Sequence, residues 1–389
     1  MTLCGAASIV GAYEHPLREI PDSTLAEIHA DVALGALADA GLTLADVDSY
    51  FCDGEAPGLG PLSMAEYLGL RCRYADSTEF GGSSYLAHVG HAAAAIAAGK
   101  CDVALITLAG KPRTGGASPG GNRAFLEAPE ADFELLWGAT VPAQYALAAR
   151  RHMYEHGTTS AQLAEIKVAA SLHAQHNPNA FLRQPVTVDE VLASPIVTDP
   201  LHRLACCVVT DGGGALVVVR PEIARSLGRG SATLLGHGEA LKHSDNGRID
   251  VTVTGAIRSG PAAFEEAGVT PADVDYVSIY DSFTITVLQT IEDLGFCAKG
   301  DGGPFVADGN LISGTGKLPF NTDGGGLCNN HPGNRGGMTK VIEAVRQLRG
   351  EAHPAVQVPD CEIAVAHGTG GTLSGRMGSV TLVLGREDL

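Results

Sequence analysis

A short sequence pattern occurs twice in this chain, once in each half. Residues 40–48 read AGLTLADVD and residues 267–275 read AGVTPADVD. A second pair follows in the same order, with CDVAL at residues 101–105 and CEIAV at residues 361–365. Each half reads as strand, helix, strand, loop, small-residue helix and strand. Two matches in the same order predict a duplicated α/β fold in which helices cover the sheet of each half.

Local patterns support these elements. Short apolar runs at residues 6–12, 47–52 and 102–107 predict buried strands, and the periodicity of residues 23–40 predicts a helix. Residues 90–98 are almost all alanine, which predicts a helix packed closely on every side.

One long segment has no counterpart in the second half. It runs from about residue 110 to residue 204 and contains helical patterns at 144–156 and 160–175. We therefore expect an N-terminal half over residues 1–220 that includes this inserted loop domain. The C-terminal half then covers residues 221–389.

A glycine-rich stretch covers residues 321–337 and contains six glycines in seventeen residues. This content disfavours a regular helix or strand, because glycine loses the most backbone entropy on ordering. A helical pattern follows directly, so the stretch brings His331 to the start of a helix. The loop could present this imidazole and its backbone N–H groups to a ligand. A structural histidine in a turn is the alternative.

Composition limits the classes of function. The chain has 389 residues, of which 45% are hydrophobic, and a formal net charge of −18. An acidic balance argues against a nucleic-acid surface or an anionic membrane surface. No run of about 18 apolar residues occurs, so we expect no membrane span and a cytoplasmic location. The nine cysteines form no C-x-x-C pair, which predicts reduced thiols and no metal site.

Several motifs occur in the order and spacing of one superfamily. They are GGSS at 81–84, NPNA at 177–180, DGG at 211–213, YDSFT at 280–284, HPG at 331–333 and HGTGG at 367–371. With these motifs the chain resembles the thiolase superfamily, in the branch of the sterol-carrier-protein-type thiolases. The resemblance implies a thiolase fold, which is a duplicated five-layer α/β/α/β/α architecture with an inserted loop domain.

The chain departs from that family at the nucleophile. Thiolases carry a reactive cysteine at the N-terminus of the buried helix, where the helix dipole lowers the thiol pKa. The family spacing places Gly82 at this position, and no cysteine lies near it. Ser84 is a neighbour, but a serine without an adjacent base is a poor nucleophile. The second thiolase cysteine falls on His367. The resemblance therefore implies a thiolase scaffold without a covalent acyl-enzyme.

Three residues are left as candidate catalytic groups. His331 holds the family position that donates a hydrogen bond to a thioester oxygen, which would stabilise an enolate. Tyr280 stands where the family has asparagine or histidine, and its pKa would have to fall by roughly 3 units, about 4 kcal/mol, for it to act as a base. His367 is the alternative base. A strand-end tyrosine and a buried structural histidine are the plainer interpretations of Tyr280 and His367.

The resemblance also implies substrate-binding positions, which we expect at Gly82, Ser84, Asn330 and Gly370. Arg335 could face a carboxylate or phosphate, or be an exposed loop residue.

Tyr280 and the missing nucleophile make the chain similar to thiolase-like aldolases of steroid side-chain degradation. Those enzymes cleave a β-hydroxyacyl-CoA and work with a small partner that carries a zinc ribbon and an OB-fold. The similarity implies a coenzyme A thioester as substrate, no cofactor on this chain, and a separate partner in a heterotetramer. It also implies a homodimer formed through the region of residues 74–80.

Three functions stay open at this stage. The first is cleavage or formation of a carbon–carbon bond on an acyl-CoA. The second is an acyltransferase or condensing enzyme that uses His367, Ser84 or a group of the partner. The third is a non-catalytic subunit that binds acyl-CoA or lipid.

Overall fold

The computed structural model of the chain describes residues 2–115, 132, 140–333 and 336–387. The strands of the N-terminal half are β1 (Ser8–Glu14), β2 (Ser49–Cys52), β3 (Tyr74–Ser77), β4 (Val103–Gly110) and β7 (Gly212–Val219). Those of the C-terminal half are β8 (Ala232–Lys242), β9 (Tyr276–Ile279), β10 (Ile363–Gly371) and β11 (Met377–Arg386). A hairpin of β5 (Ile196–Thr198) and β6 (Leu201–His202) lies in the inserted segment.

The helices of the N-terminal half are α1 (Leu25–Ala40), α2 (Pro61–Leu68) and α3 (Ser84–Ala97). The inserted segment contributes α6 (Val141–His156), α7 (Ser160–Ala174) and α8 (Val188–Ala193). The remaining helices are α9 (Pro221–Leu227), α10 (Ala256–Ala267), α11 (Thr284–Asp293), α12 (Gly302–Val306), α13 (Gly325–Cys328) and α14 (Gly337–Arg349). Short 3₁₀ turns include η1 (Leu44–Asp46), η2 (Gly81–Ser83), η4 (Arg203–Ala205), η5 (Asp245–Gly247) and η6 (Pro271–Asp273).

Strand pairing shows the duplication directly. Nine strands follow the order β3-β2-β4-β7-β1-β8-β11-β10-β9, and the N-terminal order β2-β4-β7-β1 recurs as β9-β10-β11-β8. The two halves meet at β1 and β8, where Ser8 pairs with Thr233 and Ile9 with Ala232, so two half-sheets are joined at a short junction within one nine-stranded sheet. The duplicated fold predicted from the repeats is confirmed.

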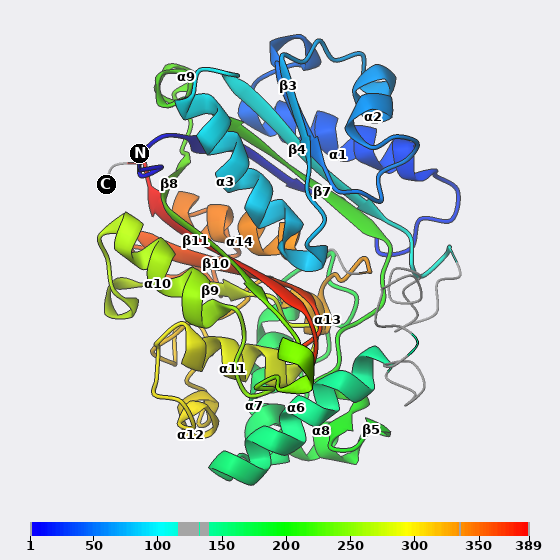
Figure 1. Cartoon of the computed structure of the whole chain (residues 1–389), viewed down its shortest axis with the longest axis vertical. Coiled ribbons are helices and arrows are strands. Elements are labelled where there is room, and N and C mark those ends of the chain that lie inside the picture. The colour runs from blue at the N-terminus through cyan, green and yellow to red at the C-terminus, as the bar shows by residue number, and fades with distance from the viewer. Residues whose placement is uncertain (1, 116–131, 133–139, 334–335, 388–389) are drawn as a thin grey trace.

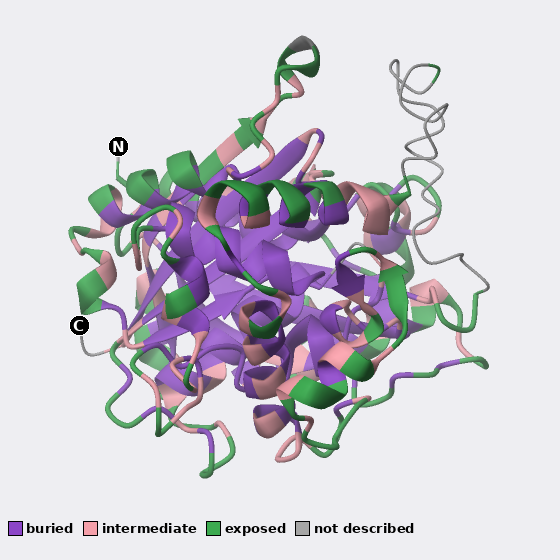
Figure 2. Ribbon diagram, turned by 90° about the horizontal axis from the view of Figure 1, so that it is seen from below, coloured by how far each residue is buried: buried purple, intermediate pink, exposed green. Residues whose placement is uncertain are grey.

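The helices form the other layers (Figure 1). Helices α3 and α14 lie between the two half-sheets and contact strands of both halves. Helix α1 packs on β1, β4 and β7 from the outside, and α10 packs on β8 and β11 from the opposite outer side. Buried residues fill the interior between these layers (Figure 2). The five-layer α/β/α/β/α order is therefore confirmed.

The repeated motif performs the same structural task in both halves. Gly41 and Gly268 end α1 and α10 in the left-handed region, at φ values of 71° and 69°. Asp48 accepts hydrogen bonds from the backbone N–H groups of residues 102 and 103. Asp275 accepts them from residues 362 and 363. Each repeat thus ties the start of one strand to the start of the neighbouring parallel strand.

The structure differs from the sequence-based expectation at two helix starts. The alanine-rich helix begins at Ser84, because η2 leads directly into it. The glycine-rich stretch contains a helical turn, α13, which begins at Gly325, and Gly324 and Gly325 have φ values of 98° and 59°. Only glycine adopts such angles without strain, so the glycines that disfavour a long helix here enable a tight one. None of the helices in the described parts of the chain is long and apolar enough to cross a membrane.

Candidate active site

Tyr280 occupies the place where a side chain at position 82 would lie. It follows β9, and its backbone N–H donates to the carbonyl of His367 at 2.9 Å. A Cβ atom on Gly82 would lie 2.3 Å from Cε2 of Tyr280 and 2.5 Å from the carbonyl oxygen of Thr369. The family position of the nucleophile is therefore filled by the phenol ring of another segment.

His331 faces this tyrosine. Its backbone N–H donates to the hydroxyl of Thr210 at 2.9 Å, which fixes the residue at the end of the glycine-rich turn. The two rings are 5.3 Å apart between centroids, edge to face at 64°. The imidazole is only 7% exposed, and its Nε2 has no hydrogen-bond partner among the described residues. Because burial lowers the pKa of His331 to about 4, the ring is neutral at neutral pH.

The prediction that Tyr280 acts as a base stays a prediction, and the surroundings of the ring oppose its ionisation. Burial raises its pKa well above the usual value, and the nearby Cys207, Tyr145 and Asp281 oppose ionisation further. A hydrogen bond from the backbone of Gly336 acts in the opposite direction but is the smaller effect. Tyr280 is therefore a protonated phenol, able to donate a hydrogen bond, whereas a base would need a lowered pKa.

Asp281 anchors the glycine-rich turn below these two rings. One carboxylate oxygen accepts from the Gly326 N–H at 2.7 Å and the other from the Leu327 N–H at 3.0 Å. A Cβ atom on Gly325 would lie 2.2 Å from the same carboxylate, so glycine is required for this close approach. The turn that carries His331 is thus held by the residue next to Tyr280.

The structure does not present Asn330 to a ligand. Its side chain accepts from the Thr210 hydroxyl at 2.7 Å and donates to Glu14 at 2.9 Å, and the residue is fully buried. That Asn330 binds substrate stays a prediction, and both polar atoms of its side chain already have partners inside the protein. Asn330 instead ties the turn to β1 and to the residues before β7.

Ser84 and Gly370 also have internal roles. The Ser84 hydroxyl accepts from the Phe80 N–H at 2.8 Å and is buried, so it closes the turn before α3. A Cβ atom on Gly370 would lie 1.5 Å from the Phe80 carbonyl oxygen, so this glycine allows β10 to approach the same turn. Both residues shape the wall around Gly82. Neither contact shows a group free to bind substrate.

The side chain of His367 lies on the face of β10 opposite to the one on which Gly368 lies. Its neighbour Gly368 faces Leu86 of the central layer, and successive residues of a strand point to opposite faces. The His367 imidazole bonds the Thr381 hydroxyl at 2.9 Å, and Thr381 bonds Ser259 of the outer helix α10. The His367 backbone therefore contacts Tyr280, but its imidazole points toward α10 and away from the Tyr280 and His331 rings. Burial lowers its pKa to about 3, as expected for a neutral structural imidazole.

Comparisons with known proteins agree with this architecture. The family described as Thiolase C-terminal domain-like matches residues 238–386. A steroid side-chain-cleaving aldolase of Thermomonospora curvata is 33% identical over 401 residues, covering 99% of each chain. An acetyl-CoA acetyltransferase of Methanothermobacter thermautotrophicus is 33% identical over 377 residues, covering 94% of this chain and 96% of the relative. The chain belongs to the thiolase family.

A solved structure titled Ltp2-ChsH2(DUF35) aldolase resembles this thiolase-family chain throughout. The TM-score is 0.88 at 30% sequence identity, and the match covers 99% of both chains. The fold and the family predicted from the motifs are therefore both confirmed.

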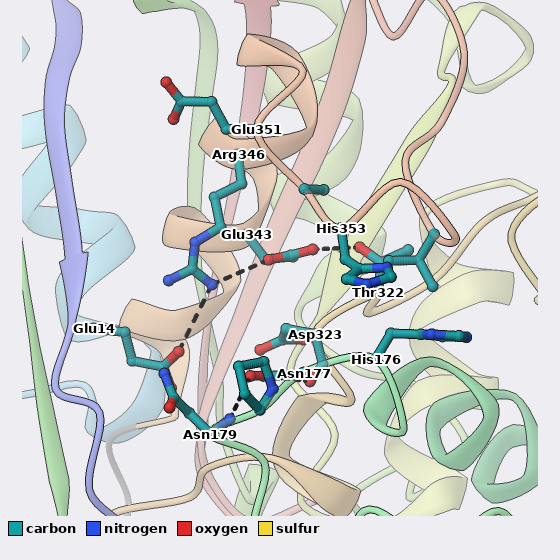
Figure 3. Close-up of a pocket in the computed structure, with 13 residues that line it drawn as sticks. Glu14, His176, Asn177, Asn179, Thr322, Asp323, Glu343, Arg346, Glu351 and His353 are labelled. Carbon is teal, nitrogen blue, oxygen red and sulfur yellow. Dashed lines mark hydrogen bonds and ion pairs between the residues drawn. The ribbon is translucent and has the colours of Figure 1, made fainter.

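A separate cavity of about 320 Å³ lies beside the base of the glycine-rich stretch (Figure 3). Arg346 stands between Glu14 at 3.7 Å and Glu343 at 3.3 Å. Glu343 also accepts from the Thr322 hydroxyl at 2.6 Å, and burial raises its pKa to about 7. None of the predicted catalytic residues lines this cavity. One of its charged residues, Glu343, thus holds Thr322 near the start of the glycine-rich stretch.

Sequence reasoning missed two residues near Tyr280. Tyr145 of α6 stacks on Phe283 at 4.3 Å, and its hydroxyl donates to the Gly371 carbonyl at 3.2 Å. Cys207 bonds the Ser282 carbonyl through its backbone at 2.8 Å. Both come from the inserted segment or its end, far from Tyr280 in sequence, and no motif marks them. Arg335 lies outside the described residues, which contain no cluster of metal-binding side chains.

Proposed function

We propose that this thiolase-family chain catalyses retro-aldol cleavage of a β-hydroxyacyl-CoA without a covalent acyl-enzyme. The observation that carries the proposal is the packing of the Tyr280 ring into the space of a side chain at position 82, opposite His331. A carbon–carbon cleavage of this kind needs a proton acceptor for the β-hydroxyl and a hydrogen-bond donor for the enolate. It needs no nucleophile.

The protonation states suggest how the two groups divide this work. His331 is neutral with an unpartnered Nε2, so it can accept the proton of the β-hydroxyl. The bond between the α and β carbons then breaks, and its electron pair forms the thioester enolate while the β carbon becomes a carbonyl. The Tyr280 O–H donates to the enolate oxygen as negative charge develops there. The His331 imidazolium returns its proton to the α carbon, which leaves the protein unchanged.

This assignment reverses the roles expected from the resemblance, in which Tyr280 was the base. The reason is burial, which opposes charge on both rings and so keeps the phenol protonated and the imidazole unprotonated.

The relatives supply the substrate class and the partner in this proposal. The steroid side-chain-cleaving aldolase favours a steroid side-chain thioester, and the Ltp2-ChsH2(DUF35) title names a second component beside the thiolase-like chain. We therefore expect the present chain to work with a separate zinc-ribbon and OB-fold polypeptide, as a homodimer within a heterotetramer. Coenzyme A enters as part of the substrate, and the chain itself holds no cofactor.

The acetyltransferase relative keeps acyl transfer as a second candidate. Acyl transfer through this site would require a nucleophile, but position 82 is glycine and the Ser84 hydroxyl is engaged with Phe80. The geometry therefore favours the lyase.

The test combines turnover with trapping. The chain, purified with any polypeptide that accompanies it, is incubated with a β-hydroxyacyl-CoA of a steroid side chain, and mass spectrometry follows the carbonyl and shortened acyl-CoA products. We expect both products and no acylated protein after an acid quench with labelled acyl-CoA. A stoichiometric acyl adduct would instead support the acyltransferase. Tight binding of the thioester without turnover, with the accompanying polypeptide present, would support a non-catalytic subunit.

A further inference from the structure

A lysine is buried near the two candidate catalytic rings. Lys340 of α14 is 1% exposed, and its ammonium lies 2.9 Å from one carboxylate oxygen of Asp281. Asp281, also 1% exposed, directly follows Tyr280. A buried charge is costly unless it is paired, so this pair is sensitive to the loss of either member.

The same carboxylate lies close to His331. It accepts the N–H groups of Gly326 and Leu327 in the turn before His331. A Cβ atom on Gly326 would lie 3.0 Å from both the Asp281 carboxylate and Cδ2 of His331, so the two groups border the same glycine. The charge state of Asp281 and its partner therefore acts on the imidazole at short range.

We infer that Lys340 is a positioning residue of the site: by pairing with Asp281 it fixes the turn that carries His331 opposite Tyr280 and balances the carboxylate charge beside the imidazole. This inference deepens the proposed function and rests on it.

The electrostatic part has a definite sign. Burial is the largest influence on the pKa of His331, the charge of Asp281 raises it, and the charge of Lys340 lowers it. Tyr280 also faces the imidazole, and Cys207 and Tyr145 lie near that phenol. If Lys340 loses its charge, the unbalanced carboxylate favours the imidazolium, which can no longer accept a proton. Lys340 thus helps to keep His331 in its reactive neutral form.

The first experiment measures the protonation of His331 without using activity. The full chain is prepared with ¹³C-labelled histidine, and NMR follows the signals of the imidazole rings from about pH 8 to about pH 5. The signal of His331 is the one that is missing from the spectrum of His331→Gln. We expect His331 to stay neutral in the parent and to titrate within this range in Lys340→Met. The double variant Asp281→Asn/Lys340→Met carries neither charge, and in it His331 should again stay neutral.

The second experiment measures turnover by the same proteins with the accompanying polypeptide. Lys340→Met should lower kcat at least about 10-fold with KM changed less than about threefold, because the turn no longer fixes His331 opposite Tyr280 for the chemical step. Lys340→Arg should recover part of the rate by restoring the charge. Lys299→Met is the matched control, since Lys299 pairs with Glu292 and Asp293 at the far end of α11. It should change neither readout.

The outcomes separate this inference from the proposed function. If the parent protein cleaves nothing, the proposed function fails while the NMR comparison still tests the ion pair. If His331 stays neutral in folded Lys340→Met, or titrates equally in the double variant, the inference is overturned. If circular dichroism shows that Lys340→Met is unfolded, Lys340→Gln takes its place in both comparisons. A Lys340→Gln protein with neutral His331 and the parent kcat would equally overturn it.

Discussion

The two halves of this molecule share one architecture and differ where their central helices begin. In the N-terminal half the residue after β2 is Asp53, which accepts a 2.6 Å hydrogen bond from Tyr85. At the matching place after β9 the C-terminal half has Tyr280, whose ring lies against Gly82 of the other half. The N-terminal half therefore contributes a glycine without a side chain at the site, and the C-terminal half contributes the side chains Tyr280 and His331.

This difference shows how a duplicated scaffold acquires a new site. The strand order and the motifs that tie neighbouring strands are preserved in both halves, because they stabilise the fold. The residues that follow the matching strands differ, with Asp53 after β2 and Tyr280 after β9. The helix starts also meet closely, since a Cβ on Gly337 would lie 1.7 Å from the Gly82 carbonyl oxygen. A larger side chain at the helix start of one half would therefore clash with the other half.

The largest effect should follow from removing the hydroxyl that only the C-terminal half supplies. We expect Tyr280→Phe to lower single-turnover cleavage by about 10²–10³-fold with little change in KM, because the enolate loses a hydrogen-bond donor while substrate binding elsewhere is untouched. Tyr50→Phe is the matched control in the N-terminal half, where the buried Tyr50 hydroxyl bonds Thr107 at 2.6 Å. Its rate should equal that of the parent. A Tyr280→Phe rate within about threefold of the parent would remove this tyrosine from the chemistry.

The next effect distinguishes two histidines of the same half. His331→Ala removes the proposed base and should lower turnover by about 10²-fold, the lower end for a general base, because its pKa of about 4 lies well below neutral pH. His367→Ala should change it less than about tenfold, because that imidazole bonds Thr381 on the outer face of the sheet. Rates are measured on protein whose fold has been checked by circular dichroism. A larger loss for His367 than for His331 would contradict the placement of the site.

A smaller effect should come from refilling the nucleophile position. Gly82→Cys places a side chain against the Tyr280 ring, so we expect the free energy of unfolding to fall by about 1–3 kcal/mol. Urea denaturation measures this, and labelled acyl-CoA should leave no adduct on the new thiol. In a Tyr280→Ala background the same substitution should cost less. An equal cost in both backgrounds would show that the ring is not the obstacle.

The smallest effect is a pH dependence shared by the two halves. Burial lowers the pKa of His88 to about 4 and that of His367 to about 3. The unfolded chain then binds more protons as the pH falls below the ordinary histidine pKa, so stability decreases toward acid. Between about pH 6.5 and about pH 5, each ring lowers the free energy of unfolding by about 1 kcal/mol for every pH unit of acidification.

Urea titrations of His88→Gln and His367→Gln across this range test the pH effect. Each variant should have a shallower pH slope than the parent, by a similar amount in either half. An unchanged slope in His367→Gln would mean that this imidazole is already charged in the native protein.

Much of the fold follows from local sequence. The duplicated motif, the apolar strand runs and the alanine-rich helix predict the elements because they depend on neighbours a few residues apart. The glycine at position 82 is likewise a property of the sequence, and with it the absence of a thiol nucleophile there. The sequence alone also places His331 in the glycine-rich stretch that precedes α14.

The roles of the site residues were decided by the tertiary structure. Both faces of β10 are buried, so no apolar alternation indicates which face His367 joins, and only the packing of α10 against β11 settles it. Asn330 is polar in a polar loop, yet Glu14 and Thr210, distant in sequence, satisfy it. The charge states of Tyr280 and His331 depend on desolvation, which arises when the two halves close over them. Proximity and burial across the chain are properties of the assembled layers, and no local pattern contains them.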